Sequence, residues 1–346
     1  MSLRFKLLAG ALASSTALIL VLRLMTLGPW ATSKDGAAAG KPALQVGYLP
    51  VTCHLTCPVL DFSSKITPTR FEALRFTDFP SVVESVKAGR LDASFMILPL
   101  AMKLREQGLP VKIVYLGHRD GSTLIIRKND PATGLAGLKG KILAIPSRYS
   151  NQYLVLIKLM QKQGISLTDI NFVELAPPDM PAALAAGSID AYFVGEPHAA
   201  KAEFDGTGRV LYMAKDIWPG FISCGLVVTE RLINDKPSVV ADLVRGIAES
   251  GEWADAHRLE AASVAAPYFK QNRALVEYVL TQPPDRVSYR MLTPGDQELE
   301  LMQETAISAG LLHKHVDIAQ LVDRRFIPPD LHQADIKAPP QETRQQ

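Results

Sequence analysis

The residues whose types and spacing could do chemistry lie in three short segments. The first, Thr52 to Cys57 (TCHLTC), holds two of the three cysteines of the chain and a histidine. Cys53 and Cys57 are four residues apart, so a helical turn would place both on one face, with His54 adjacent. Three interpretations stay open: a disulfide in an oxidising compartment, a soft-metal site completed by His54 or His198, and packing as small apolar groups.

The second segment, Ser147 to Asn151, follows a predicted strand that ends at Pro146 and opens a predicted helix. Free backbone amides, hydroxyl groups and the positive helix end could converge there on an anion or a carboxylate. Alternatively, Ser147 only caps the helix and Arg148 is solvated.

The third segment belongs to an internal repeat. Phe79 to Lys103 aligns without a gap with Pro177 to Lys201. Each copy reads as a helix closed by glycine, followed by a short apolar strand of the kind that is buried on both faces. The chain therefore uses one supersecondary unit twice, which predicts two similar α/β lobes.

The two copies differ where their strands end. Glu196 and His198 stand where the first copy has Leu98 and Leu100. This asymmetry indicates contact with a ligand, because a carboxylate accepts hydrogen bonds and an imidazole can donate one to an oxyanion. Alternatively, Glu196 pairs with a nearby Lys or Arg, and His198 is half exposed.

Composition limits the class of protein. The chain has 346 residues, of which 47% are apolar and 21% charged, with a net charge of +2. These values fit a globular protein of about two domains and exclude disorder and a polytopic membrane protein. The folded part has no Lys/Arg block, so nucleic acid is not an expected partner.

The N-terminus predicts export. Basic residues precede the apolar run 7–22, and Arg23 follows it, which is typical of a signal peptide or of a short inner-membrane anchor. We assign residues 1–31 to this segment and the Ala/Gly-rich residues 32–42 to a linker. Cleaved and anchored forms both stay open.

The remaining elements predict an α/β fold with two lobes, each a mostly parallel sheet flanked by helices. Residues 43–126 and 223–327 form the first lobe, and residues 127–222 form the second. The C-terminal helices, including a long one over 237–269 that breaks near Pro267, are expected to pack on the first lobe. Residues 328–346 form a polar, flexible tail.

Four stretches carry a resemblance to a known family: GYLP, KAGRLDASFMILPLAMKLREQG, IPSRYS and DMPAALAAGSIDAYFVGEPHAAKAE. Together they resemble the nitrate/sulfonate/taurine/bicarbonate family of ABC-transporter solute-binding proteins, which also contains the thiamine-pyrimidine binders. The resemblance runs from about residue 44 to residue 309. It implies a type II-like periplasmic binding fold and a periplasmic monomer. Such a protein passes a small solute, here anionic or oxyanion-bearing, to an ABC permease, without catalysis and without a cofactor.

The resemblance and the physics of open sheets place the solute at the carboxyl ends of the strands, between the lobes. The expected ligand-binding residues are Pro50, Thr52, Cys53, His54, Leu98, Pro99, Ser147, Arg148, Tyr149, Ser150, Asn151, Gly195, Glu196, His198 and Cys224.

The segment TCHLTC departs from the family, whose corresponding loop is usually small and polar without a cysteine pair. A metal site of Cys53, His54 and Cys57 is therefore a second expectation. The alternative function is an exported metal- or thiol-dependent protein, either a binder of a thiophilic ligand or an enzyme. The sequence has no GxSxG, P-loop, HExxH or Rossmann motif, so a binding protein is the favoured interpretation.

Overall fold

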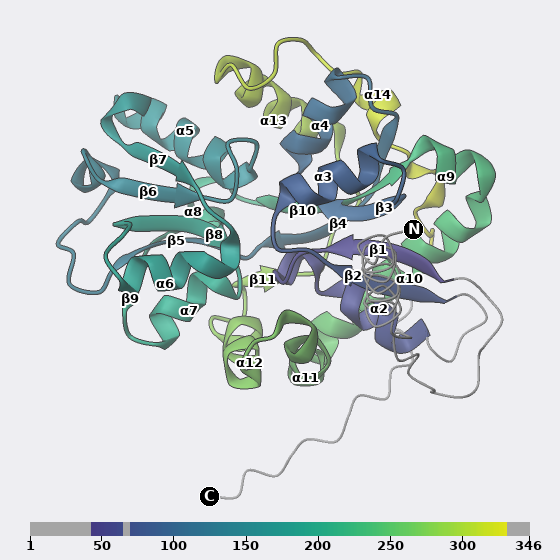
Figure 1. Ribbon diagram of the computed structural model, residues 1–346, viewed down its shortest axis with the longest axis horizontal. Coiled ribbons are helices and arrows are strands. Elements are labelled where there is room, and N and C mark those ends of the chain that lie inside the picture. The colour runs from purple at the N-terminus through teal and green to yellow at the C-terminus, as the bar shows by residue number, and fades with distance from the viewer. Residues whose placement is uncertain (1–42, 65–69, 331–346) are drawn as a thin grey trace, which may run out of the picture. The chain divides into compact units, whose positions relative to one another are not determined.

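The computed structural model describes residues 43–64 and 70–330, which form two β-sheets flanked by helices (Figure 1). The first sheet has the strand order β11-β4-β10-β3-β1-β2 and consists of β1 (Leu44–Tyr48), β2 (Phe71–Arg75), β3 (Ala93–Met96), β4 (Val111–Asp120), β10 (Ile222–Thr229) and β11 (Val287–Ser288). The second has the order β7-β6-β8-β5-β9 and consists of β5 (Ser122–Arg127), β6 (Ile142–Ile145), β7 (Asn171–Glu174), β8 (Ala191–Gly195) and β9 (Gly208–Met213). The predicted α/β fold class is confirmed.

Helices cover both faces of each sheet (Figure 1). On the first sheet, α3 (Phe79–Lys87) and α4 (Leu98–Glu106) lie opposite α2 (Thr56–Ser64) and α10 (Pro237–Ala256); on the second, α5 (Asn151–Gln163) lies opposite α6 (Met180–Ala185) and α7 (His198–Phe204). The other helices are α8 (Ala214–Ile217), α9 (Glu230–Asp235), α11 (Arg258–Phe269), α12 (Arg273–Thr281), α13 (Asp296–Ser308) and α14 (Ile318–Leu321). Short 3-10 helices are η1 (Thr52–His54), η2 (Leu135–Leu138), η3 (Leu167–Asp169), η4 (Pro177–Asp179) and η5 (Arg324–Phe326).

The sequence repeat appears as two helix–strand–helix units, α3-β3-α4 and α6-β8-α7. Gly89 and Gly187 follow the first helix of each unit with φ of 67° and 74°, a conformation that strains a residue with a Cβ. Both strands are buried along their whole length. The repeated unit is therefore confirmed.

The strand pairing is mixed, and in each sheet most strands run in one direction, as predicted. β1 is parallel to β2 and β3, and β6 is parallel to β7 and β8. In contrast, β10 is antiparallel to β3 and β4, and β5 is antiparallel to β8 and β9. Both β5 and β10 are the first strands after the chain crosses between sheets. The chain enters at the edge where the parallel strands end, so these two strands run the opposite way.

Two boundaries and the packing of the C-terminal helices also differ from the prediction. Residues 122–126 were assigned to the first lobe, but β5 pairs within the second sheet, because an apolar strand fits either sheet equally well. The long C-terminal helix breaks at His257, whose φ of −125° is not helical, and Pro267 lies inside α11. The C-terminal helices do not contact the first sheet's elements alone, since α12 contacts α7 and α13 contacts α5.

None of the helices in the described ranges is long and apolar enough to cross a membrane. The predicted signal or anchor over residues 7–22, the linker up to residue 42 and most of the predicted tail lie outside the described residues.

Candidate functional site

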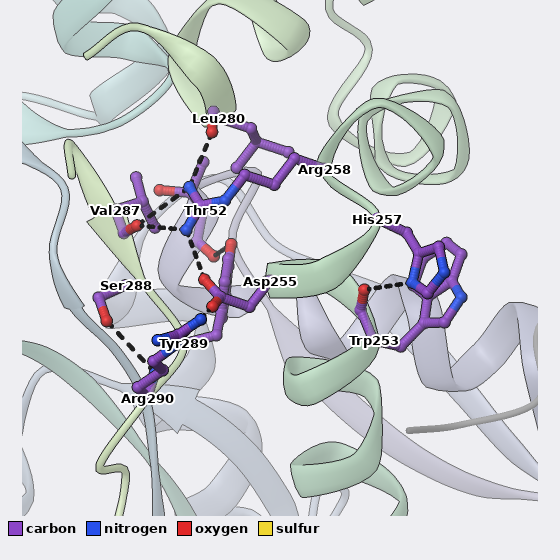
Figure 2. A network of polar contacts seen from close by, with 10 residues as sticks. All are labelled: Thr52, Trp253, Asp255, His257, Arg258, Leu280, Val287, Ser288, Tyr289 and Arg290. Atoms are coloured by element: carbon purple, nitrogen blue, oxygen red, sulfur yellow. Dashed lines mark hydrogen bonds and ion pairs between the residues drawn. The ribbon is translucent and has the colours of Figure 1, made fainter. Parts of the chain in front are cut away.

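The loop after β1 lies where the two sheets meet. Its backbone amide at Thr52 donates to the carbonyl of Glu196 at 2.6 Å, which links it to the loop after β8. The Thr52 hydroxyl lies 2.8 Å from Nε2 of His118. The Thr52 carbonyl accepts a hydrogen bond from the Tyr289 hydroxyl at 2.9 Å (Figure 2). All these side chains are buried. Residues of β1, β4, β8 and the segment after α12 therefore converge on one interior point.

The three cysteines are free and buried. Cys53, His54 and Cys224 lie together, each with a potential ligand atom within 4.8 Å of the others. Cys57 is not part of this group, and its thiol donates to the carbonyl of Val46 at 3.6 Å. The predicted set Cys53, His54 and Cys57 is therefore not brought together, because the Cys57 thiol turns to the backbone of β1. Cys224 takes its place in the group.

The two neighbouring thiols differ in acidity. Burial raises the pKa of the Cys53 thiol, but the neighbouring Cys224 thiol and the His54 ring outweigh this effect and bring the pKa well below its ordinary value. Burial, together with the sulfur of Cys53, raises the pKa of Cys224 well above its ordinary value. The pair therefore favours one thiolate next to one thiol.

His54 is held by its backbone neighbour and by aromatic contacts. Its Nδ1 accepts the amide proton of Leu49 at 2.7 Å, and its ring stacks on Phe95 at a centroid distance of 5.2 Å. Nε2 is buried and has no hydrogen-bond partner among the described residues. The neutral ring therefore carries its proton on Nε2.

Glu196 is fully buried and paired. It receives hydrogen bonds from Nη1 of Arg286 at 3.0 Å, from the Thr123 hydroxyl at 3.1 Å and from the amide of Ala200 at 2.7 Å. Arg286 also reaches Glu203 at 2.9 Å. Burial raises the pKa of Glu196, and Arg286 acts in the opposite direction. The structure therefore shows the second interpretation, in which Glu196 pairs with a cation, here Arg286.

His198 is buried rather than half exposed, and burial lowers its pKa to about 4. Its Nε2 has no partner in the described part of the chain. Arg75, at the carboxyl end of β2, is close enough to act electrostatically on His198, and its buried Nε also has no partner there. Two nitrogen atoms without partners thus lie on neighbouring segments.

The loop after β6 is organised mainly by its own hydrogen bonds. Ser150 caps α5 by accepting from the amide of Tyr153, while Ser147 accepts from the amide of Tyr149. The exposed Arg148 donates to the Tyr153 hydroxyl at 3.2 Å, and its backbone amide donates to Glu174. Capping therefore falls to Ser150 rather than to Ser147.

Two buried amide side chains follow this cap. Asn151 donates to the carbonyl of Ile222 and Gln152 to the hydroxyl of Ser122 at 2.9 Å, which ties α5 to both crossings between the sheets. A narrow pocket with room for about one water molecule lies next to Asn151. It is lined by Asn151, Leu154, Trp218, Gly220, Phe221, Ile222, Glu298 and Met302.

The other predicted residues are buried at strand or helix ends. Leu98 and Pro99 open α4, Pro50 follows β1, and Gly195 ends β8. Nζ of Lys103 in α4 lies 6.0 Å from the ring centroid of Tyr149, so the loops of the two sheets also approach each other here.

Sequence reasoning missed Arg75, His118, Arg286 and Tyr289. Arg286 follows two prolines in a segment without hydrophobic periodicity, and nothing in the sequence relates it to Glu196. Arg75 was also not singled out, because the strand was predicted over residues 73–77. Only the observed end of β2 at Arg75 places this side chain at the sheet edge where ligands bind.

The arrangement of two mixed sheets with strand ends facing each other is that of periplasmic binding proteins. The ligand-binding component of an ABC-type import system from Staphylococcus aureus, solved with zinc bound, matches with a TM-score of 0.74 and 25% identity over 83% of this chain and 98% of its own. An alkanesulfonate-binding protein from Xanthomonas axonopodis, solved with MOPS bound, matches with a TM-score of 0.69 and 22% identity over 83% of this chain and 100% of its own.

Sequence comparison gives the family. The model of the NMT1-like family matches residues 37–268, and the chain belongs to this family. The resemblance inferred from its motifs is thereby confirmed. A curated relative, the nitrate import ATP-binding protein NrtC of Synechocystis, is 27% identical over 291 residues. That match includes 78% of this chain but 42% of the relative, so the chain spans less than half the length of that protein.

Proposed function

We propose that this chain is an extracytoplasmic solute-binding protein, which captures a small anionic solute between its two sheets and delivers it to an ABC permease. Its family and the import and sulfonate-binding proteins that share its fold support this role. The N-terminal run 7–22 would direct export and could hold the protein at the inner membrane. The protein would act as a monomer, without turnover.

The observation that carries the proposal is the meeting of strand ends from both sheets. The loop after β1 contacts the loop after β8 through the bond from Thr52 to Glu196, and α4 approaches the loop after β6 near Tyr149. In open α/β sheets this is where ligands bind. The loops are in contact, so we interpret this arrangement as the closed form.

Closure would occur about the two crossings. The first crossing passes through Asp120 and Gly121, both with positive φ, and the second enters β10 at Ile222. Short segments of this kind absorb the rotation in hinge motions. The binding set would be the predicted residues of the facing loops, with Arg75 added.

Arg75 supports an anionic solute. The buried Nε of Arg75 has no hydrogen-bond partner among the described residues, and a guanidinium N–H of this kind favours binding of a carboxylate, sulfonate or nitrate. His198 is neutral near pH 7, because burial lowers its pKa to about 4, so it would contribute one hydrogen bond but no charge. Arg148, by contrast, is directed toward Tyr153 and contributes less.

The test is calorimetry with a panel of solutes matched in size: nitrate, bicarbonate, taurine, an alkanesulfonate and a short carboxylate, against neutral amides and primary amines. At least one anion is expected to bind with a dissociation constant in the micromolar range, and small-angle scattering is expected to show compaction when it does. Binding of amines alone, or binding without compaction, would contradict the proposal.

The alternative, a metal- or thiol-dependent enzyme that uses Cys53, His54 and Cys57, is not favoured. The thiol of Cys57 is engaged by Val46 in the core of the first sheet, away from the other two groups. Turnover of a substrate by the purified protein alone would restore it.

A further inference from the structure

The cluster around Cys53 includes residues of the loop after β1, at the proposed solute site, and has features that solute capture does not require. Two thiols from segments far apart in the sequence, η1 and β10, have their sulfur atoms within 4.8 Å of each other. The thiol of Cys224 donates to the carbonyl of Cys53 at 3.1 Å. Both side chains are buried, and neither is in a disulfide.

The close approach of the two cysteines depends on Gly117 in β4. A Cβ at this position would lie 2.1 Å from the Cys53 carbonyl oxygen and 2.4 Å from the sulfur of Cys224. Any other residue would therefore push η1 away from β10. Gly117 leaves the space in which the two sulfur atoms face each other.

His54 does not have a free lone pair for a metal ion. Its Nδ1 lone pair is taken by the amide of Leu49, so Nε2 carries the proton of the neutral ring. Histidines that bind metals show the reverse pattern, in which the second nitrogen donates to a carbonyl or a carboxylate. His54 is therefore suited to donate an N–H toward a thiolate. A tetrahedral zinc site, which needs four ligands, is not completed by this group.

We propose that Cys53 and Cys224 form a binding site for one soft monovalent metal ion of the Cu(I) or Ag(I) class, held between the two sulfur atoms. Thiolates select such ions over harder divalent ones. Two metal–sulfur bonds of about 2.3 Å, the length in zinc thiolate sites, span about 4.6 Å in a line. The two sulfur atoms lie no more than 4.8 Å apart, so a bent arrangement of sulfur, metal and sulfur bridges them at any separation below about 4.6 Å.

Binding forms two metal–sulfur bonds, and the metal ion replaces every proton that the two sulfur atoms carry. These protons go to solvent, which leaves one net negative charge on the complex of one monovalent ion and two thiolates. A ring nitrogen of His54 lies within 4.8 Å of both sulfur atoms, and the apolar Phe95 ring stacks on the His54 ring beside them. The ion would enter from the side of η1, where the bond from Thr52 to Glu196 closes the loop.

The test uses the full chain, reduced and free of oxygen, with Ag(I) as a probe that undergoes no redox change. Native mass spectrometry is expected to show one bound ion, and X-ray absorption of the wild-type complex is expected to show two sulfur neighbours. Failure to bind Ag(I), or a nitrogen neighbour in the absorption spectrum, would overturn the proposal. This measurement needs no variant, so it does not depend on how a substitution affects folding.

Variants locate the site. Cys53→Ser and Cys224→Ser are each expected to weaken binding of the ion by more than about 100-fold. This is more than the loss that follows when a residue that only hydrogen-bonds to a metal ligand is removed. Cys57→Ser is the matched control and is expected to bind like the wild type, because its thiol lies outside the group. His54→Gln is expected to keep affinity within about tenfold. Equal loss in the Cys57 variant, or loss in the His54 variant as large as in the cysteine variants, would refute the two-sulfur site.

Discussion

Replacing Arg286 by methionine removes the cation that compensates a fully buried carboxylate. Arg286 and Glu196 have side chains that are 2% and 0% exposed, and Nη1 lies 3.0 Å from Oε1. Methionine keeps most of the apolar volume of arginine, so packing around Tyr278 changes little. The variant therefore isolates the loss of charge.

The expected cost follows from the environment of Glu196. Removing one partner of a buried ion pair costs about 3 to 5 kcal/mol, because the other charge is left uncompensated. Glu196 retains its bonds from Thr123 and Ala200, which places the estimate at about 3 kcal/mol. For a chain of this size that corresponds to a fall in melting temperature of about 5 °C.

The loss is also expected to depend on pH. Burial raises the pKa of Glu196, and removing Arg286, the largest opposing influence, raises it further. A carboxyl whose folded pKa exceeds its unfolded pKa binds more protons in the folded state. Stability is therefore lost as pH rises through the folded pKa, and the deficit is smaller at pH 5 than at pH 8.

Denaturant unfolding followed by circular dichroism measures these differences. Arg290→Met is the control: Arg290 is 74% exposed, and its partner Asp255 keeps a second arginine, Arg258 (Figure 2). Its cost is expected to stay below about 1 kcal/mol. In the double variant Glu196→Gln with Arg286→Met, much of the lost stability returns, because no buried charge remains. If Arg286→Met costs no more than Arg290→Met, or the double variant recovers nothing, the reasoning is wrong.

Three further outcomes are expected. Arg75→Ala weakens binding of the anionic solute by about 1.5 to 3 kcal/mol, the range for a charge-assisted hydrogen bond, while Arg148→Ala changes it little; calorimetry showing the reverse would move the anion site to the loop after β6. Because burial lowers the pKa of His198 from 6.5 to about 4, the unfolded chain binds more protons between these values, and stability is lost as pH falls from 6.5 to 4. His198→Asn is expected to reduce this loss of unfolding free energy by on the order of 3 kcal/mol. Unfolding measured over a series of acid pH values checks this, and an unchanged loss would contradict it. Gly117→Ala is expected to cost at least about 1 to 3 kcal/mol, because its Cβ meets the backbone of Cys53, and a melting curve like that of the wild type would show that η1 yields freely.

The local sequence pattern was sufficient to predict the helices, the strands and the fold class. The strands at 93–96 and 191–195 are continuous apolar runs that follow an Asp, and Gly89 and Gly187 take the positive φ at which only glycine is unstrained. These features depend on residues close together in the sequence, so hydrophobic periodicity and the residue types at turns predict them. The motifs around Gly195 to His198 likewise identified the family.

Tertiary structure decided which sheet each strand joins and which side chains meet. The run 122–127 is buried on both faces wherever it pairs, so its composition could not reveal that it lies in the second sheet. Cys53 meets Cys224 rather than Cys57, because η1 packs against β4 and β10, and Glu196 meets Arg286 across 90 residues of sequence. The sequence by itself determined the helices, the strands, the repeat and the family, since these depend on residues a few positions apart. The partners of buried charges and thiols depend on long-range packing, which has no local signature, and only the folded chain decided them.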